Sequence, residues 1–167
     1  VRDARIAQIY EGTNGIQAMD LVGRKLPKDG GRAIRAFLAL VGGEIAEAKA
    51  AGDPAGVAAA LDPALGDLQS ATMWLAQNGM KDPNNAGAGA YPYMDLMGLV
   101  SLGWMWMKMA GVSSKALEHG SGDRQFHEAK LATARFYAER ELVAATSLRR
   151  KVEAGAESVM AIPEEVF

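Results

Sequence analysis

The chain has 167 residues, of which 49% are apolar and 23% are charged, and its formal net charge is −2. These values exclude a disordered protein, and the length allows one helical domain with a core, or one domain plus a fragment of another. A charge this close to zero argues against nucleic-acid binding, and the absence of cysteine excludes disulfides, thiol nucleophiles and thiolate zinc sites.

Helical spacing of apolar residues recurs throughout the chain, and no convincing run alternates as a strand would. We therefore expect an all-α protein, an antiparallel helical bundle of about four long helices. The predicted helical segments are a short one that ends near Ile9, one from about Asn14 to Lys25, and longer ones at about 31–51, 54–80, 91–112 and 123–154.

The first segment opens inside a helical pattern at Val1, without the charged and apolar leader of a signal peptide. We expect the sequence to begin inside a longer chain. Asn14, with Gln17 three residues later, resembles a capping arrangement at the start of the next helix. The Leu-Pro-Lys-Asp-Gly-Gly run at 26–31 predicts a linker, so we divide the chain into domains 1–28 and 29–167.

Three of the four longer helices carry an apolar stripe at steps of three or four residues, as helices that pack together do. These stripes consist of Ile34, Phe37, Leu38, Val41 and Ile45 in the first, Leu61, Leu65, Leu68, Thr72 and Leu75 in the second, and Leu131, Ala134, Ala138, Leu142, Ala145, Leu148 and Val152 in the last. Residues 81–90 are rich in Asn, Gly and Pro, and we expect a loop there.

Residues 96–107 are apolar on nearly all sides of the predicted helix, which calls for burial by the domain itself or by another chain. The run is much shorter than a membrane span needs, because Asp95 and Lys108 bound it. Methionine is concentrated in this segment and adapts well to irregular surfaces. A core helix and an oligomer interface both remain open.

Two kinds of candidate site can be judged from residue type alone. His119 and His127 lie eight residues apart without further converging ligands, so we expect no metal site. Glu11 stands between an apolar helix end and a Gly-Thr-Asn-Gly turn. Held against apolar surface, such a carboxylate has the raised pKa of a general base, whereas in an open turn it is merely solvated.

The segment from Arg2 to Gln17, which includes Tyr-Glu-Gly-Thr at 10–13, is similar nearly position by position to the catalytic-base segment of acyl-CoA dehydrogenases. The similarity continues through Leu21, Gly23, Arg24 and Leu26. It implies an FAD-dependent α,β-dehydrogenation of an acyl-CoA thioester, in which Glu11 removes the α-proton while hydride passes to the flavin. The backbone N–H of Glu11 would also stabilise the developing enolate oxygen.

The resemblance also implies roles for the neighbours of Glu11. Tyr10 and Gly12 would bind substrate, and Thr13, Asn14 and Gly15 would lie against FAD. Gly15 departs from relatives that carry a longer polar side chain there, which leaves only backbone contacts to the cofactor at that position. As alternatives, Tyr10 would be an apolar plug and Thr13 a helix cap.

The part beyond residue 30 resembles the helical C-terminal extension of larger bacterial acyl-CoA dehydrogenases, some of which act on sulfur-containing substrates such as 3-methylthiopropionyl-CoA. We expect a cytoplasmic homo-oligomer that passes electrons to an electron-transfer flavoprotein. Most of the flavin site would lie outside this chain, so the chain alone would be inactive. The alternative is a helical interaction or oligomerisation module without chemistry of its own.

Overall fold

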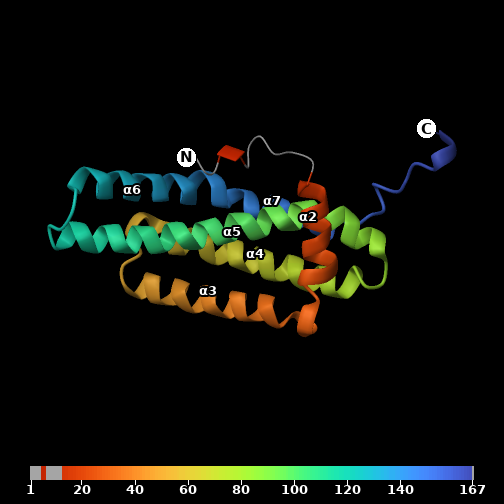
Figure 1. Ribbon diagram of the computed structural model, residues 1–167, viewed down its shortest axis with the longest axis horizontal. Coiled ribbons are helices and arrows are strands. Elements are labelled where there is room, and N and C mark those ends of the chain that lie inside the picture. The colour runs from red at the N-terminus through yellow and green to blue at the C-terminus, as the bar shows by residue number, and fades with distance from the viewer. Residues whose placement is uncertain (1–4, 7–12, 167) are drawn as a thin grey trace.

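The computed structural model describes residues 5, 6 and 13–166, with only the backbone described for Glu164, and this part of the chain holds helices and no strand. The long helices lie side by side in an antiparallel bundle, and a short N-terminal helix crosses them (Figure 1). The prediction of an all-α antiparallel bundle is confirmed. The α-helices are α2 (Asn14–Asp20), α3 (Arg32–Ala50), α4 (Val57–Asn78), α5 (Pro83–Glu118), α6 (Arg124–Phe136) and α7 (Ala145–Glu153).

Shorter turns of π- or 3₁₀-helix lie between these helices or follow the last of them. They are η1 (Leu21–Lys25), η2 (Lys28–Gly31), η3 (Pro54–Gly56), η4 (Tyr137–Glu141), η5 (Leu142–Ala144) and η6 (Glu164–Val166). The predicted helix at 123–154 is thus α6 and α7 in one rod, joined through a π turn and a 3₁₀ turn. At this junction Tyr137 donates its hydroxyl to the Leu99 carbonyl at 2.9 Å, which ties the rod to α5.

Aspartates begin three of the long helices. Asp82 accepts a hydrogen bond from the Asn84 N–H, and Asp123 accepts one from the Gln125 N–H, each at 2.9 Å. Asp53 reaches the N–H groups of both Ala58 and Ala59. These bonds satisfy backbone donors that lack a partner inside the helix, so the short connections between the rods are set by local sequence.

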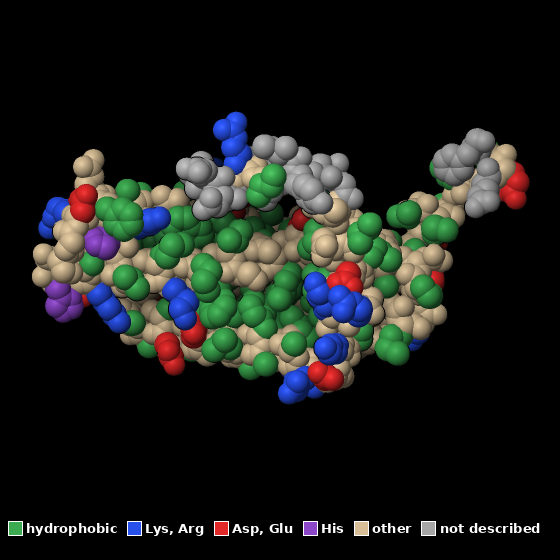
Figure 2. All heavy atoms as spheres, in the orientation of Figure 1, with side chains coloured by type: hydrophobic (Ala, Val, Ile, Leu, Met, Phe, Trp, Pro, Cys, Tyr) green, Lys and Arg blue, Asp and Glu red, His purple; other side chains and the backbone are tan. Residues whose placement is uncertain are grey.

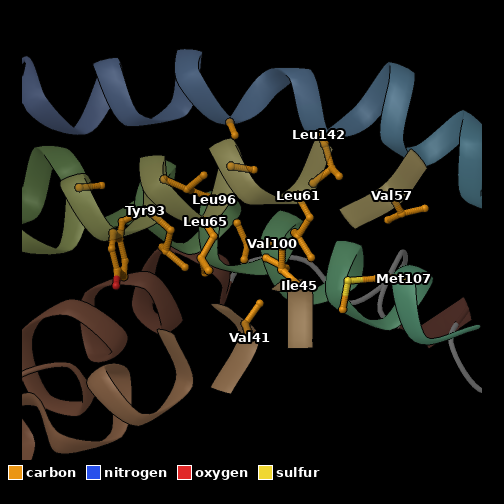
Figure 3. Packing of buried hydrophobic residues seen from close by; sticks show 14 of the residues in the cluster. Val41, Ile45, Val57, Leu61, Leu65, Tyr93, Leu96, Val100, Met107 and Leu142 are labelled. Carbon is orange, nitrogen blue, oxygen red and sulfur yellow. The ribbon is translucent and has the colours of Figure 1, made fainter. Parts of the chain in front are cut away.

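The apolar stripes predicted from spacing meet in one core (Figure 3). Val41 and Ile45 of α3 point toward Leu61 of α4 and Val100 of α5, all of them buried. From the last rod, Ala134, Ala138, Leu142, Ala145 and Val152 are also buried, while Leu131 and Leu148 pack at the edge. The helix faces chosen from the sequence are therefore the faces that form the core.

The predicted loop at 81–90 is wrong, because α5 begins at Pro83 and runs without a break through this segment. A proline suits the first turn of a helix, where its missing N–H is not needed. Small residues follow because neighbouring helices come close: a Cβ on Gly89 would lie 3.2 Å from Leu75 Cδ2 and 3.4 Å from Val152 Cγ1. At Gly89 the small residue therefore reflects close packing rather than a turn.

The Met-rich segment at 96–107 lies in the middle of α5, and only one of its sides is buried. Leu96, Val100 and Met107 point into the core, which confirms the interpretation as a core helix for that side. Leu102 and Met105 are exposed on the opposite side. Within the described residues, none of the helices has the length and apolar character that a membrane crossing requires.

Candidate functional site

The structure describes only part of the predicted catalytic-base loop. Tyr10, Glu11 and Gly12 lie outside the described residues, whereas Thr13, Asn14 and Gly15 begin α2. Asn14 and Gly15 are exposed, and a Cβ on Gly15 would meet nothing within 4 Å. The backbone at this turn is therefore open to contact from a ligand or from another part of the protein.

The capping arrangement predicted for Asn14 and Gln17 is wrong by one residue. Thr13 occupies the N-cap position, and its carbonyl accepts the Gln17 N–H at 2.9 Å, while its side chain makes no capping bond. Thr13 has helical backbone angles, φ −110° and ψ −9°, instead of the extended angles that aim a capping hydroxyl at the helix. Its hydroxyl is thus not engaged in a cap.

The helix that follows this turn is anchored to the bundle. Ala18 of α2 and Val22 of η1 are buried in the same core as the long helices, and α2 packs on α5. Leu21 and Leu26 pack at the edge of that core. The turn at 13–15 is therefore held in a defined position relative to α5, although it lies at the surface.

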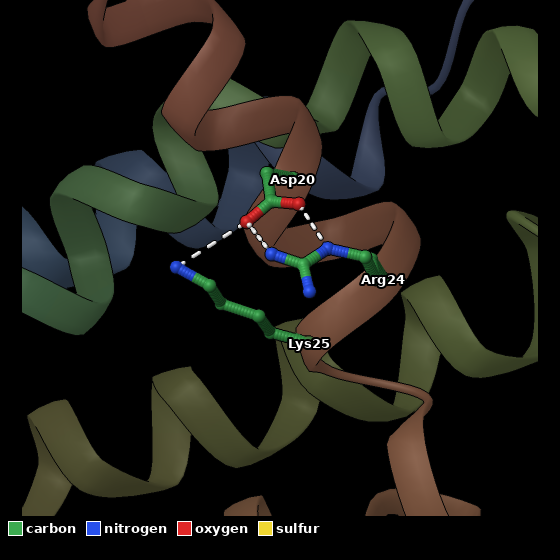
Figure 4. A network of polar contacts seen from close by, with 3 residues as sticks. All are labelled: Asp20, Arg24 and Lys25. Carbon is green, nitrogen blue, oxygen red and sulfur yellow. Dashed lines mark hydrogen bonds and ion pairs between the residues drawn. The ribbon is translucent and has the colours of Figure 1, made fainter.

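A polar network fixes the junction between α2 and η1 (Figure 4). Asp20 pairs with Arg24 through two hydrogen bonds, Nε to Oδ1 at 2.5 Å and Nη2 to Oδ2 at 2.8 Å, and Lys25 Nζ lies 3.3 Å from Oδ2. The hydrogen bonds from Arg24, followed by those from Lys25, lower the pKa of Asp20 to about 2. The same pairing raises the pKa of Arg24. Asp20 therefore stays ionised at any pH at which the protein would work.

We did not assign Asp20 a role from the sequence, although a signal was present. An Asp followed four residues later by an Arg has the spacing that brings the two side chains together on a helix. Within the resemblance Arg24 matched the family pattern without a role, and the network now gives it one: it holds the turn of chain that follows α2.

A groove of about 380 Å³ runs between α3 and α5 near η3. At its edge Glu44 accepts hydrogen bonds from Trp104 Nε1 at 2.7 Å and from Lys108 Nζ at 2.8 Å. Lys108 and then Trp104 lower the pKa of Glu44 by these bonds. The lining is Glu44, Glu47, Ala48, Ala51, Asp53, Pro54, Met107, Lys108, Gly111, Ser114, Lys115 and Glu118, so the groove does not border the turn at 13–15.

The cluster around Glu44 holds α3 and α5 together. Phe37 of α3 packs edge-on against Trp104 at 5.9 Å between ring centroids, and Lys108 Nζ lies 5.1 Å from the Trp104 ring. The charged and aromatic groups satisfy one another across the two helices. The sequence around Glu44 does not reveal this cluster, because the partners of Glu44 lie some sixty residues away.

The two histidines have separate partners. His119 Nδ1 lies 2.6 Å from the Lys115 carbonyl oxygen, and His127 Nδ1 lies 3.3 Å from the buried Ser113 hydroxyl. No group of three or more His, Asp or Glu side chains that could bind a metal ion occurs among the residues described. The two histidines therefore share no partner, and the contact of His127 with Ser113 joins α6 to α5.

A comparison with known protein families identifies the family to which this helical bundle belongs. Residues 32–163 match the family model described as "Acetyl-CoA dehydrogenase C-terminal like". The chain therefore belongs to this acyl-CoA dehydrogenase family, as the resemblance of its first residues predicted. The match covers α3 to α7 and hence the whole bundle.

Curated relatives extend the similarity to residues before the bundle. The chain is 35% identical to the 3-methylmercaptopropionyl-CoA dehydrogenase of Ruegeria pomeroyi, over 95% of this chain and 27% of that protein. It is 35% identical to the broad-specificity linear acyl-CoA dehydrogenase FadE5 of Mycobacterium tuberculosis, over 100% of this chain and 29% of that protein. The butyryl-CoA dehydrogenase of Syntrophomonas wolfei is 28% identical over 99% of this chain and 28% of its own length. The chain thus spans less than a third of these relatives.

Proposed function

We propose that this chain is the C-terminal part of an FAD-dependent acyl-CoA dehydrogenase, which performs the α,β-dehydrogenation of an acyl-CoA thioester. The observation that carries the proposal is the presence of the segment Arg2–Gln17, with the family's base motif, directly before a bundle that matches the family model. In this proposal residues 1–28 end the catalytic helical domain, and residues 29–167 form the extension.

Glu11 is the proposed base. A thioester α-proton is only weakly acidic, so its removal requires a carboxylate held at the α-carbon and hydrogen bonds to the thioester oxygen. Glu11 takes this proton on its side chain, and its backbone N–H donates to the oxygen. The FAD supplies the acceptor for the hydride that leaves the β-carbon.

The residues around Glu11 have supporting roles in the proposal. Tyr10 lines the acyl pocket, and Gly12 lets the thioester approach the backbone. Thr13, Asn14 and Gly15 lie beside the FAD, and the open surface at Gly15 and the Thr13 hydroxyl, which makes no capping bond to α2, fit that contact. The described residues contribute only this border of the flavin site, so we propose that the isolated chain neither retains flavin nor turns over substrate.

The substrate class and the partners are proposed from the family to which the chain belongs. Two relatives are named for different single substrates and the third for broad specificity toward linear acyl-CoAs, at 28–35% identity to the same chain. We infer that acyl-chain preference is set by residues outside this chain. We further propose an electron-transfer flavoprotein as electron acceptor, a homo-oligomeric assembly and a cytoplasmic location.

The test is the Glu11→Gln variant of the full-length protein, mixed anaerobically with acyl-CoA while the flavin absorbance is followed. We expect the rate of flavin reduction to fall by about 10²–10⁴-fold, since a carboxamide does not accept the proton. Glu47→Gln, which changes an exposed carboxylate of the bundle, is the matched control and keeps the rate. Retention of most of the reduction rate in Glu11→Gln would refute the assignment.

The alternative is a non-catalytic helical interaction module, and the exposure of Leu102 and Met105 on α5 favours it. In that case the full-length protein binds no flavin, and Glu11→Gln changes nothing. Yellow colour and a flavin spectrum in the purified full-length protein, absent from the isolated chain, distinguish the two functions.

A further inference from the structure

The outer face of α5 is an apolar surface that the bundle leaves uncovered. We define it by Leu102, Met105, Met109 and Val112, of which Leu102 is 57% and Val112 is 66% exposed and Met109 is half-buried. Hydrophobic side chains gather along α5 between α3 and α6 in Figure 2. Large continuous apolar patches are rare on soluble proteins and often mark a surface that binds another molecule.

Helix geometry shows that this face takes no part in the bundle's core. Val100, Gly103 and Met107 point inward, and the residues of the outer face follow on the opposite side at steps of three and four. The helices α3, α4, α6 and α7 all contact α5 on its remaining sides. The bundle therefore does not require large apolar side chains at these positions.

The outer face also lacks charge. Between Leu96 and Val112 the only charged residue is Lys108, and its ammonium group is held by Glu44 toward α3. A charged partner would find no complement here. An apolar protein surface fits best, and the methionines suit an irregular one.

The position of helix α2 indicates which part of the protein supplies the apolar surface that covers the outer face. It packs on α5, and Figure 1 shows it crossing the bundle on the side that α5 occupies. While Ala18 faces the core, Ile16 and Met19 of the same helix are exposed. A helix with apolar residues on its outer side as well as on its core side is covered by a second layer of protein.

We propose that the outer face of α5 is the docking surface for the remaining, N-terminal body of the dehydrogenase polypeptide. This inference rests on the proposed function, in which α2 belongs to the catalytic helical domain. The other helices of that domain cover Ile16 and Met19 and therefore lie next to α5. The relatives are more than three times as long as this chain, which leaves ample polypeptide to form that layer. The extension then supports the base loop through α2 and α5 together.

Methionine oxidation tests this placement, because peroxide converts only accessible thioethers to sulfoxides. The probe is Met105 on the outer face, and the internal control is Met73 on the exposed side of α4. Both are compared by mass spectrometry in the full-length protein and in the 167-residue chain, which has a core of its own. We expect Met105 to oxidise severalfold more slowly in the full-length protein, with Met73 unchanged.

A pair of matched variants makes the test specific. Val112→Asp in the full-length protein is expected to loosen the docking and restore oxidation of Met105. Val143→Asp is the control, since Val143 is 67% exposed, against 66% for Val112, and lies in η5, away from the outer face. Both variants are expected to leave the fold of the isolated chain intact because neither side chain is buried.

Three outcomes would overturn the proposal. One is equal oxidation of Met105 in the two proteins, and another is restoration by Val143→Asp as readily as by Val112→Asp. The third is protection of Met105 in the isolated chain that grows with its concentration, which would assign the face to a second copy. Flavin reduction is measured on the same full-length samples. A protected Met105 without flavin reduction refutes only the proposed function, and the reverse refutes only the docking.

Discussion

Removing the hydroxyl of Tyr93 tests how α4 and α5 are joined. Tyr93 is fully buried, and its oxygen lies 2.8 Å from Thr72 Oγ1. Thr72 Oγ1 already donates to the Leu68 carbonyl at 2.7 Å, so the Tyr93 hydroxyl is the donor in the shared bond. The ring itself packs in the core shown in Figure 3.

Tyr93→Phe and Thr72→Val are expected to lower the free energy of unfolding by different amounts. Tyr93→Phe keeps the ring and removes the donor, which lowers the free energy of unfolding by about 1 kcal/mol. Thr72→Val keeps the shape and leaves the buried Tyr93 hydroxyl without an acceptor, which lowers it by about 1–3 kcal/mol. In the double variant nothing polar is left unpaired, so its loss should be smaller than the sum of the single losses by about 1 kcal/mol.

Denaturant unfolding followed by circular dichroism gives all four free energies, and thermal unfolding gives an independent measure. For a domain of this size each kcal/mol shifts the Tm by about 2–4 °C. Losses that add within error would show that the two hydroxyls are not coupled, and would refute the hydrogen bond between them.

Three further predictions concern stability. Leu61→Ala, at a fully buried position, should lower the free energy of unfolding by about 2–5 kcal/mol in denaturant titrations; a loss below 1 kcal/mol would contradict the core described for α4. Gly155→Ala should lower the Tm, because φ is +69° and the new Cβ would lie 2.9 Å from the Asn85 side-chain oxygen, whereas Gly66→Ala, in an open helical position, should raise it. Burial raises the pKa values of Tyr93 and Tyr137 to about 12, aided at Tyr137 by a nearby carboxylate. Both tyrosines lose their protons at a lower pH in the unfolded chain than in the folded one. The free energy of unfolding is therefore unaffected below pH about 10 and falls as the pH rises toward about 12. A free energy of unfolding that stays constant between these pH values would contradict the burial of the two side chains.

Only those parts of the candidate site that lie in one continuous segment of sequence could be predicted. The base motif at 10–13 is a continuous segment, and its resemblance to the family needs no tertiary structure to be seen. The Asp20–Arg24 pair was open to prediction from its spacing and was missed. The cluster of Glu44, Trp104 and Lys108 could not be predicted, because nothing in the sequence near Glu44 indicates a partner on a helix two elements later.

The class of fold and the buried side of α3, α4 and the α6–α7 rod follow from the sequence, since the apolar steps of three and four residues are a property of the single helix. The same steps missed the first turns of α5. There Gly89 packs against Leu75 and Val152, and only the presence of these neighbours distinguishes close packing from a loop. Tertiary structure alone decided that one side of residues 96–107 enters the core while the outer face stays uncovered. An apolar residue is buried only where another element supplies the surface against it, and that surface is set by how the helices assemble.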